Sequence, residues 1–457
     1  MTNSVLFSRI FTLIAVCLCI FIKNTQLAFF TVALALLAFF LFNFKSFSKK
    51  EIRVFCVVFM TAAMFYNFST NALTKNNDRY STFQADSESL VTGMIDAKNA
   101  GIKDLGVYGL GRYAPEENVI KFYKSCYGLQ GKFFSFFYKF TKNHEFCCLL
   151  LAIVLALIVY FISIKYNNLL AFCFFITFLL SPWIVNFARN LYWVEFTWFV
   201  PMLLGIIISM NYKNKKVVIP CFAGIFVSVF IKSLCGYEYL SAILLAMIAV
   251  PVIDFFESIF NRDFKNAFFI FKTIFIMGCL AVLGFIIALL LHAGIKGNGN
   301  IIAGLKKIYE GDFLRRMFGG NPEDFAPNYK ASLEASVRTV ICKYYTFTTE
   351  IIAGIPGSWF TLLSIMPIFF FIFRSLYNKA ILQDVLLYFV FYITCISWFI
   401  IGKSHSYVHT HMNYVMWYFG FIQVCFYIFI KQLKELICSG LNLISKNFIA
   451  DNHEDKE

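Results

Sequence analysis

The sequence predicts an all-α polytopic membrane protein with about 12 transmembrane helices and two long extracytoplasmic loops that carry interfacial helices. Three observations lead to this fold class. Of the 457 residues, 60% are hydrophobic and 14% are charged, whereas soluble domains carry roughly 25% charged residues. The apolar residues form blocks of about 17–27 residues, long enough for a helix to cross about 30 Å of hydrocarbon. Basic residues gather at the ends of alternate blocks.

Twelve segments have the length and composition of a transmembrane helix. They are residues 5–22, 26–44, 54–70, 146–164, 168–187, 191–210, 217–232, 238–256, 267–292, 351–373, 382–401 and 412–430. They divide the chain into three helices (1–70), a long loop (71–145), six helices (146–292), a second long loop (293–350), three helices (351–430) and an amphipathic tail (431–457).

The distribution of lysine and arginine sets the predicted orientation. With an even number of spans, the basic clusters share one side, which the positive-inside rule identifies as cytoplasmic. The clusters include Lys45, Lys49, Lys50 and Arg53; Lys213, Lys215 and Lys216; Arg262 and Lys265; Arg374 and Lys379; and Lys431 and Lys434. Both termini are then cytoplasmic and both long loops face outside, in a cell membrane that we expect to be a bacterial inner membrane. The net charge of +14 follows from this bias, so nucleic acid is not an expected partner.

The first long loop begins with an acidic pair, Asp86 and Glu88. An apolar stripe at helical spacing follows, and Gly101 is a suitable stop, so the segment predicts a helix lying on the membrane surface. A carboxylate there could act as a general base toward an acceptor hydroxyl. The alternative is structural, because Asp86 is also a good N-cap and Glu88 is favourable in a first turn.

Basic and aromatic residues interleave between Lys121 and Lys139, in the second half of the same loop. Long basic side chains and aromatic rings both favour the boundary between lipid and water. The segment therefore predicts an interfacial helix that leads into the fourth span.

Three of the six histidines lie in one short outward turn: His405, His409 and His411. Lys403 and Tyr407 share this turn. Histidine and lysine at a membrane surface can bind a lipid phosphate or diphosphate. A metal site is a second interpretation, because His405 and His409 would share a helix face. A polar turn with an interfacial tyrosine is the third.

Two other outward turns carry candidate ligands. Tyr237 and Glu238 occupy a very short hairpin between spans, where a carboxylate is costly unless it reaches water or a partner. Glu238 could orient a sugar hydroxyl, although interfacial tyrosines are also common. Arg189 lies at a similar outward edge and is a candidate phosphate ligand.

The stretch from Ala85 to Gly101 resembles the start of the acidic loop in the GT-C glycosyltransferases, which are polytopic enzymes that use polyprenyl-phosphate sugars. The likeness in architecture extends over roughly the whole chain, and the likeness in motif over about 81–101. The resemblance implies that Asp86 is the general base and that basic groups hold the lipid phosphate. One departure is that three predicted spans precede the acidic loop, where the family usually has one.

We therefore expect transfer of a sugar from a polyprenyl-phosphate donor to a glycan, a lipid-linked glycan or a protein, with inversion if attack is direct. The expected roles are catalysis by Asp86 and Glu88, phosphate binding by Arg189, Lys403, His405 and His409, and sugar or acceptor binding by Tyr237, Glu238 and Tyr407. A divalent cation stays open as a cofactor. One alternative is an O-antigen or surface-polysaccharide polymerase or ligase, in which arginine and histidine would matter most. Another is a transporter or flippase for lipid-linked glycans, which should carry charges deep within its spans.

Overall fold

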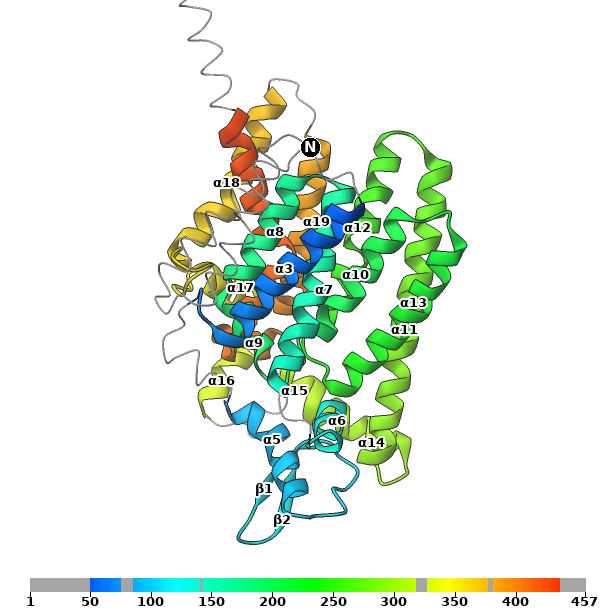
Figure 1. Ribbon diagram of the computed structural model, residues 1–457, viewed down its shortest axis with the longest axis vertical. Helices are drawn as coiled ribbons and strands as arrows, with labels where there is room; N and C mark the ends of the chain where they lie inside the picture. Colours follow the sequence, from blue (N-terminus) through cyan, green and yellow to red (C-terminus); the bar gives the residue numbers. More distant parts are fainter. Residues whose placement is uncertain (1–49, 75–84, 140–142, 318–326, 377–380, 436–457) are drawn as a thin grey trace, which may run out of the picture.

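The computed structural model describes residues 50–74, 85–139, 143–317, 327–376 and 381–435. Long helices form the body of the molecule, and their axes run mostly along its long dimension (Figure 1). Shorter elements gather at one end, where Figure 1 places α5, β1, β2, α6, α14 and α15. We call this the loop end.

Seven helices in the described part of the chain are long and apolar enough to cross a membrane. They are α3 (Lys50–Thr70), α7 (Asn143–Lys165), α11 (Lys215–Cys235), α12 (Leu240–Phe260), α13 (Phe264–Lys296), Gly357–Ser375 with α18 (Phe360–Leu376), and α19 (Leu382–Ile401). The number within the described residues rises to nine if each of two bent pairs is one span: α8 (Asn168–Leu180) with α9 (Pro182–Ala188), and Thr410–Tyr418 with Phe421–Glu435. The helix α10 (Phe196–Met210) is apolar but shorter.

The predicted spans from 54–70 onward each coincide with one of these helices or bent pairs. The first two predicted spans, 5–22 and 26–44, lie outside the described residues, so a total of twelve remains a prediction. The span predicted at 191–210 begins later, because residues up to Glu195 form turns and Val194 has a φ of +40°.

Proline explains the bend of 62° between α8 and α9. Pro182 lacks a backbone N–H and starts the new helix, and Ser181 caps it by accepting the Ile184 N–H. The break frees the Leu180 carbonyl, which accepts the Ala353 N–H at 2.9 Å. All seven residues of α9 are buried, so this short helix directs the chain through the interior to Arg189.

The first long loop contains α5 (Ala85–Asn99), the strands β1 (Gly111–Ala114) and β2 (Val119–Phe122), and α6 (Leu129–Phe136). The strands pair in an antiparallel hairpin, so the described chain is not entirely helical. The interfacial helix predicted between Lys121 and Lys139 was wrong for its first part, which is β2 and an irregular segment. Gly128, with φ of +79°, precedes α6, and only the part after it is helical.

The helix α5 has the form that its sequence predicts. Val91, Met94 and Ala97 are buried along one face, and Gly101 adopts a φ of +86° just beyond the helix end. The Ile102 N–H closes the end by donating to the Ala97 carbonyl at 3.1 Å. This packing fixes the first turn of α5, which carries Asp86 and Glu88.

The second long loop contains α14 (Ile301–Ile308), η1 (Tyr309–Phe313), α15 (Leu314–Arg316), α16 (Pro327–Glu334) and α17 (Val337–Tyr345). Beyond α19 the chain forms α20 (Lys403–Val408), α21 (Thr410–Asn413) and η4 (Tyr414–Tyr418). The Ser404 N–H donates to the Met317 carbonyl just after α15, so α20 also lies at the loop end.

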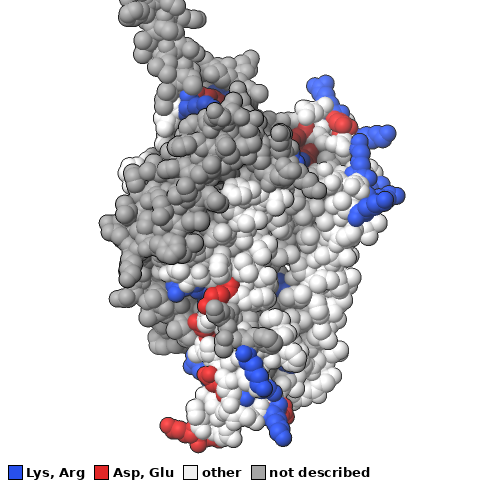
Figure 2. Space-filling view, viewed as in Figure 1, with Lys and Arg blue, Asp and Glu red and all other residues white. Residues whose placement is uncertain are grey.

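Buried ion pairs join the helices near the opposite end. The Asp254 carboxylate of α12 binds Lys165 of α7 at 2.7 Å and the Tyr212 hydroxyl at 2.9 Å. Asp384 of α19 binds Lys431 and Arg374. In Figure 2 an uncharged belt separates this end, with its exposed lysines and arginines, from the charges of the loop end. The exposed basic residues there include Lys213, Lys215, Lys216, Arg262 and Lys265.

The two loop cysteines differ in exposure, and this makes the predicted orientation testable. Cys126 is buried and Cys342 on α17 is exposed, and both are free thiols. Burial also raises the pKa of Cys126, which makes it a poor probe. We expect a membrane-impermeant maleimide to label Cys342 in intact cells, and Cys342→Ser to abolish that labelling.

Lys215→Cys, placed in the Cys342→Ser background, is the matched control because residue 215 is exposed at the opposite end. It should react only after the membrane is opened. Labelling of residue 215 in intact cells, with Cys342 protected, would reverse the predicted orientation.

Candidate functional site

A carboxylate and an imidazole from separate elements meet at the loop end. Oε1 of Glu88, in the first turn of α5, is 2.6 Å from Nε2 of His144, in the first turn of α7. The same oxygen accepts the Leu191 N–H at 3.2 Å. The Glu88 side chain is 26% exposed and that of His144 is 49% exposed, so solvent reaches the pair. Asp86 belongs to the same turn of α5, but its side chain lies outside the described part of the chain.

Arg189 follows α9 in a segment that contacts both α7 and α5. The carbonyl of Ala188 accepts the Cys148 thiol of α7 at 3.4 Å, and Leu191 reaches Glu88. Arg189 is half-buried, and its guanidinium makes no ion pair or hydrogen bond with another described residue. The structure thus brings Glu88 and Arg189 into one region, as the sequence predicts, and adds His144.

Glu238 lies in the turn between α11 and α12 and forms a buried ion pair. Its Oε1 accepts a hydrogen bond from Nη2 of Arg316, in α15, at 2.8 Å. Both side chains are at most 10% exposed. Nη1 of Arg316 also donates to the Asp312 carbonyl at 3.1 Å. Asp312 in turn pairs with Lys296 at the end of α13. This chain of charges connects the second long loop to the helix bundle.

The pKa of Glu238 reflects two opposing effects. Burial would raise it, but the neighbouring charges of Arg316 and Lys232 outweigh burial and lower it below the ordinary value of 4.5. Glu238 is therefore ionised at neutral pH. Its Oε1 is occupied by the arginine, so its main contact is with protein and not with solvent.

Tyr237 binds a buried histidine, His292. Its hydroxyl lies 2.9 Å from Nδ1 of His292 in α13, and Nε2 of His292 lies 3.3 Å from the Lys124 carbonyl. A carbonyl can only accept, so the neutral ring carries its proton on Nε2 and accepts the Tyr237 hydroxyl at Nδ1. Tyr237 thereby connects the α11–α12 turn to α13 and the first loop.

Two residues of the predicted phosphate turn have protein partners. The Lys403 ammonium donates to the Leu333 and Ala335 carbonyls at 2.8 and 2.7 Å, near the end of α16. The ammonium of Lys343 lies 3.7 Å from the centre of the Tyr407 ring and donates to the Tyr407 carbonyl. Lys403 therefore stabilises the packing of α20 against α16.

His405 lies among aromatic rings and has one polar partner in the described chain. Its Nδ1 accepts the Asn413 amide at 3.0 Å, while the Asn413 oxygen accepts the Tyr239 hydroxyl at 2.7 Å. An amide nitrogen can only donate, so neutral His405 keeps its proton on Nε2. Burial, followed by the charge of His409, lowers the pKa of His405 well below 6.5, so it is neutral at pH 7.

Other basic side chains lie near His405 at the loop end. Its ring centre is 4.6 Å from that of His409, which is 5.7 Å from that of His411. Arg315 and Arg316 also act on His405 electrostatically, and Arg315 is exposed. We call His405, His409, His411 and Arg315 the basic cluster. No group of three or more His, Cys, Asp or Glu side chains within the described residues could hold a metal ion.

Two contacts relate the turn at Glu238 to its neighbours. Arg316 binds Glu238, while the adjacent Arg315 belongs to the basic cluster. The Tyr239 ring centre is 6.2 Å from that of His405 and 5.5 Å from that of Trp193, in the turn after Arg189. Tyr239 therefore contacts both the histidine turn and the turn that follows Arg189.

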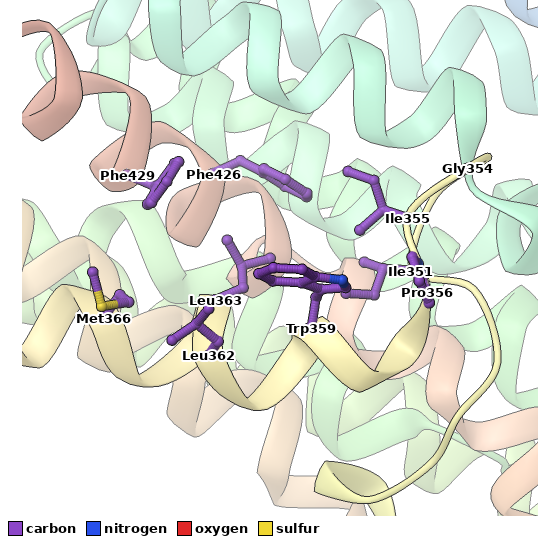
Figure 3. A pocket seen from close by; sticks show the side chains of 10 residues that line it. All are labelled: Ile351, Gly354, Ile355, Pro356, Trp359, Leu362, Leu363, Met366, Phe426 and Phe429. Carbon is purple, nitrogen blue, oxygen red and sulfur yellow. The ribbon is translucent and has the colours of Figure 1, made fainter.

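An apolar groove lies between α18 and the helix Phe421–Glu435 (Figure 3). Its volume is about 340 Å³. The lining residues are Ile351, Gly354, Ile355, Pro356, Trp359, Leu362, Leu363, Met366, Phe426 and Phe429. The adjacent Glu350 carbonyl accepts the Trp183 indole of α9 at 3.0 Å, which connects the groove to the short helix that leads to Arg189.

Removal of Arg316 should destabilise the protein, because the Glu238 charge would stay buried without its partner. We expect Arg316→Met to lower the free energy of unfolding by about 3–5 kcal/mol, because an unpaired carboxylate stays buried. Thermal unfolding in detergent measures the change. The double variant Glu238→Leu/Arg316→Met should lose less than Arg316→Met alone. Equal losses would mean that the pair does not couple these elements.

The same pair predicts a pH dependence. Because the folded pKa of Glu238 is lowered, the ionised carboxylate contributes stability above 4.5 that is lost as the pH falls through the folded pKa. The stability difference between the native protein and Glu238→Gln should therefore be largest near neutral pH and shrink below 4.5. A difference that grows on acidification would contradict this assignment.

No family model, curated protein or solved structure matches the chain. The resemblance to GT-C glycosyltransferases therefore depends on the acidic loop and on the predicted architecture.

Proposed function

We propose that the protein is an integral-membrane glycosyltransferase. It moves a sugar from a polyprenyl-phosphate donor to a glycan, lipid-linked glycan or protein acceptor at the loop end, on the extracytoplasmic side. One observation carries the proposal: the solvent-accessible Glu88–His144 pair lies beside the segment of Arg189, whose guanidinium has no partner among the described residues. Proton acceptance and binding of a phosphate leaving group are the two requirements of this transfer.

The donor phosphate binds to Arg189, and Arg315 of the basic cluster supplies further positive charge at the same end. Arg315 replaces Lys403 as a phosphate ligand, because the Lys403 ammonium already binds two backbone carbonyls. Neutral His405 can donate a hydrogen bond from Nε2 but adds no charge. The base comes from the junction of α5 with α7, where Asp86 and His144 are the candidates.

The apolar groove suits the hydrocarbon chain of the donor. Its lining is apolar, and it connects through Trp183 and α9 to the segment that carries Arg189. A prenyl chain in the groove would gain roughly 25 cal/mol for each Å² of apolar surface removed from water. This arrangement keeps the lipid among the helices and its phosphate near the loop end.

The assay supplies a polyprenyl-phosphate sugar and a mixture of cell-envelope acceptors to the purified protein in vesicles. We expect a covalent sugar product and free polyprenyl phosphate. Arg189→Gln and Arg315→Gln should each lower kcat/KM by about tenfold or more, because they remove charge from the leaving group. Arg338→Gln is the matched control, since Arg338 is exposed on α17 and binds no part of the proposed site.

Movement of the intact lipid-linked sugar across the membrane, with no covalent product, would instead identify a transporter. Equal losses in all three variants would show only a general effect of surface charge and would reject the proposed phosphate ligands.

The groove assignment predicts a dependence on chain length. Leu363→Trp should fill part of the groove and raise KM for a long-chain donor by several fold, with little change for a short-chain analogue. Ile372→Trp is the control because Ile372 is 56% exposed on the same helix and does not line the groove. A similar KM increase for both donors would exclude the groove as the chain site.

A further inference from the structure

The contact between Glu88 and His144 assigns a role to a residue outside the predicted site. We propose that His144 is the general base of the transfer reaction and that Glu88 is its positioning residue. The inference rests on the proposed function and names the atom that receives the proton. Its basis is the distance of 2.6 Å between Nε2 of His144 and Oε1 of Glu88, two residues that are 56 positions apart in the sequence.

Hydrogen bonding determines which nitrogen of His144 can act as a base. Glu88 is a carboxylate and can only accept, so Nε2 of His144 carries a proton and donates it to Oε1. In the neutral ring the lone pair is then on Nδ1. No described residue forms a hydrogen bond with Nδ1, and the half-exposed side chain leaves it open to an acceptor.

The backbone fixes Glu88 in this position. Oε1 also accepts the Leu191 N–H at 3.2 Å, so the carboxylate joins α5, α7 and the segment after Arg189. The buried stripe of α5 holds the helix against its neighbours and limits rotation of its first turn. A base in a fixed tautomer, supported by a carboxylate, has the geometry that proton transfer requires.

The transfer step follows from these contacts. The acceptor hydroxyl gives its proton to Nδ1 of His144 as its oxygen forms a bond to the anomeric carbon of the donor sugar. The bond from that carbon to the phosphate oxygen breaks, and polyprenyl phosphate leaves with the electron pair beside Arg189. Glu88 stabilises the imidazolium until the proton passes to water.

A purely structural role is the competing explanation, in which the pair only holds α5 against α7. The two explanations differ in what free imidazole can do. His144→Ala should lower kcat by about 100-fold or more, the usual contribution of a general base. Added imidazole should restore part of the rate, because it can enter the vacated space and accept the proton.

Further variants separate folding from chemistry. His144→Gln retains a donor toward Glu88 but has no basic nitrogen, so it should fold and remain inactive. Glu88→Gln retains an acceptor without the negative charge. It should reduce kcat less than His144→Ala does and should move the acidic limb of the pH–rate profile to lower pH.

The outcomes are distinguishable. If the native protein transfers sugar and His144→Gln retains activity within a few fold, His144 is not the base and the proposed function stands. Loss of activity in Asp86→Asn, with His144→Gln active, assigns the base to Asp86. If the native protein transfers no sugar from any polyprenyl-phosphate donor, both proposals fail. Nitrogen-15 NMR of histidine-labelled protein gives a readout independent of transfer. Neutral His144 should be protonated on Nε2, and the Nδ1 tautomer would overturn the assignment.

Discussion

The buried ion pair between Arg316 and Glu238 is the interaction on which the candidate site depends. It joins the second long loop to the turn between α11 and α12, and Asp312 extends it to Lys296 at the end of α13. Removing Arg316 alone would leave the Glu238 carboxylate buried without its ion-pair partner, which makes the arrangement specific even where its net stabilisation is small. Because Arg315 is the next residue, the same pair positions an exposed cation beside His405.

The class of protein could be predicted because it depends on local composition. An apolar block of suitable length must be helical in lipid, since its backbone has no other hydrogen-bond partners. The apolar stripe of α5 and the end of the helix at Gly101 were predictable because they too depend on local sequence. The β-hairpin was not, because its two four-residue strands lie in a segment whose aromatic and basic residues suggested an interfacial helix.

The site was only partly predictable, because its contacts join distant segments. The acidic turn and Arg189 were found as isolated polar features beside apolar blocks. His144 was overlooked, although it also stands at the start of an apolar block, and only the fold shows that it faces Glu88. Similarly, the sequence suggests that Lys403 is available to bind an anion. In the fold its ammonium instead donates to backbone carbonyls of a segment about 70 residues away. Residue type indicated where chemistry was possible, and long-range packing determined which groups had spare bonding capacity.

The central claim is that the protein joins a sugar to an acceptor, and mass spectrometry of cells lacking the chain tests it most directly. In these cells we predict that a polyprenyl-phosphate sugar accumulates and that one cell-envelope glycan, glycolipid or glycoprotein lacks that sugar. Expression of the native chain should restore both, and Arg189→Gln should restore them incompletely. If these cells still make every glycosylated lipid, but one lipid-linked glycan stays on the cytoplasmic leaflet, the protein is a transporter and not a glycosyltransferase.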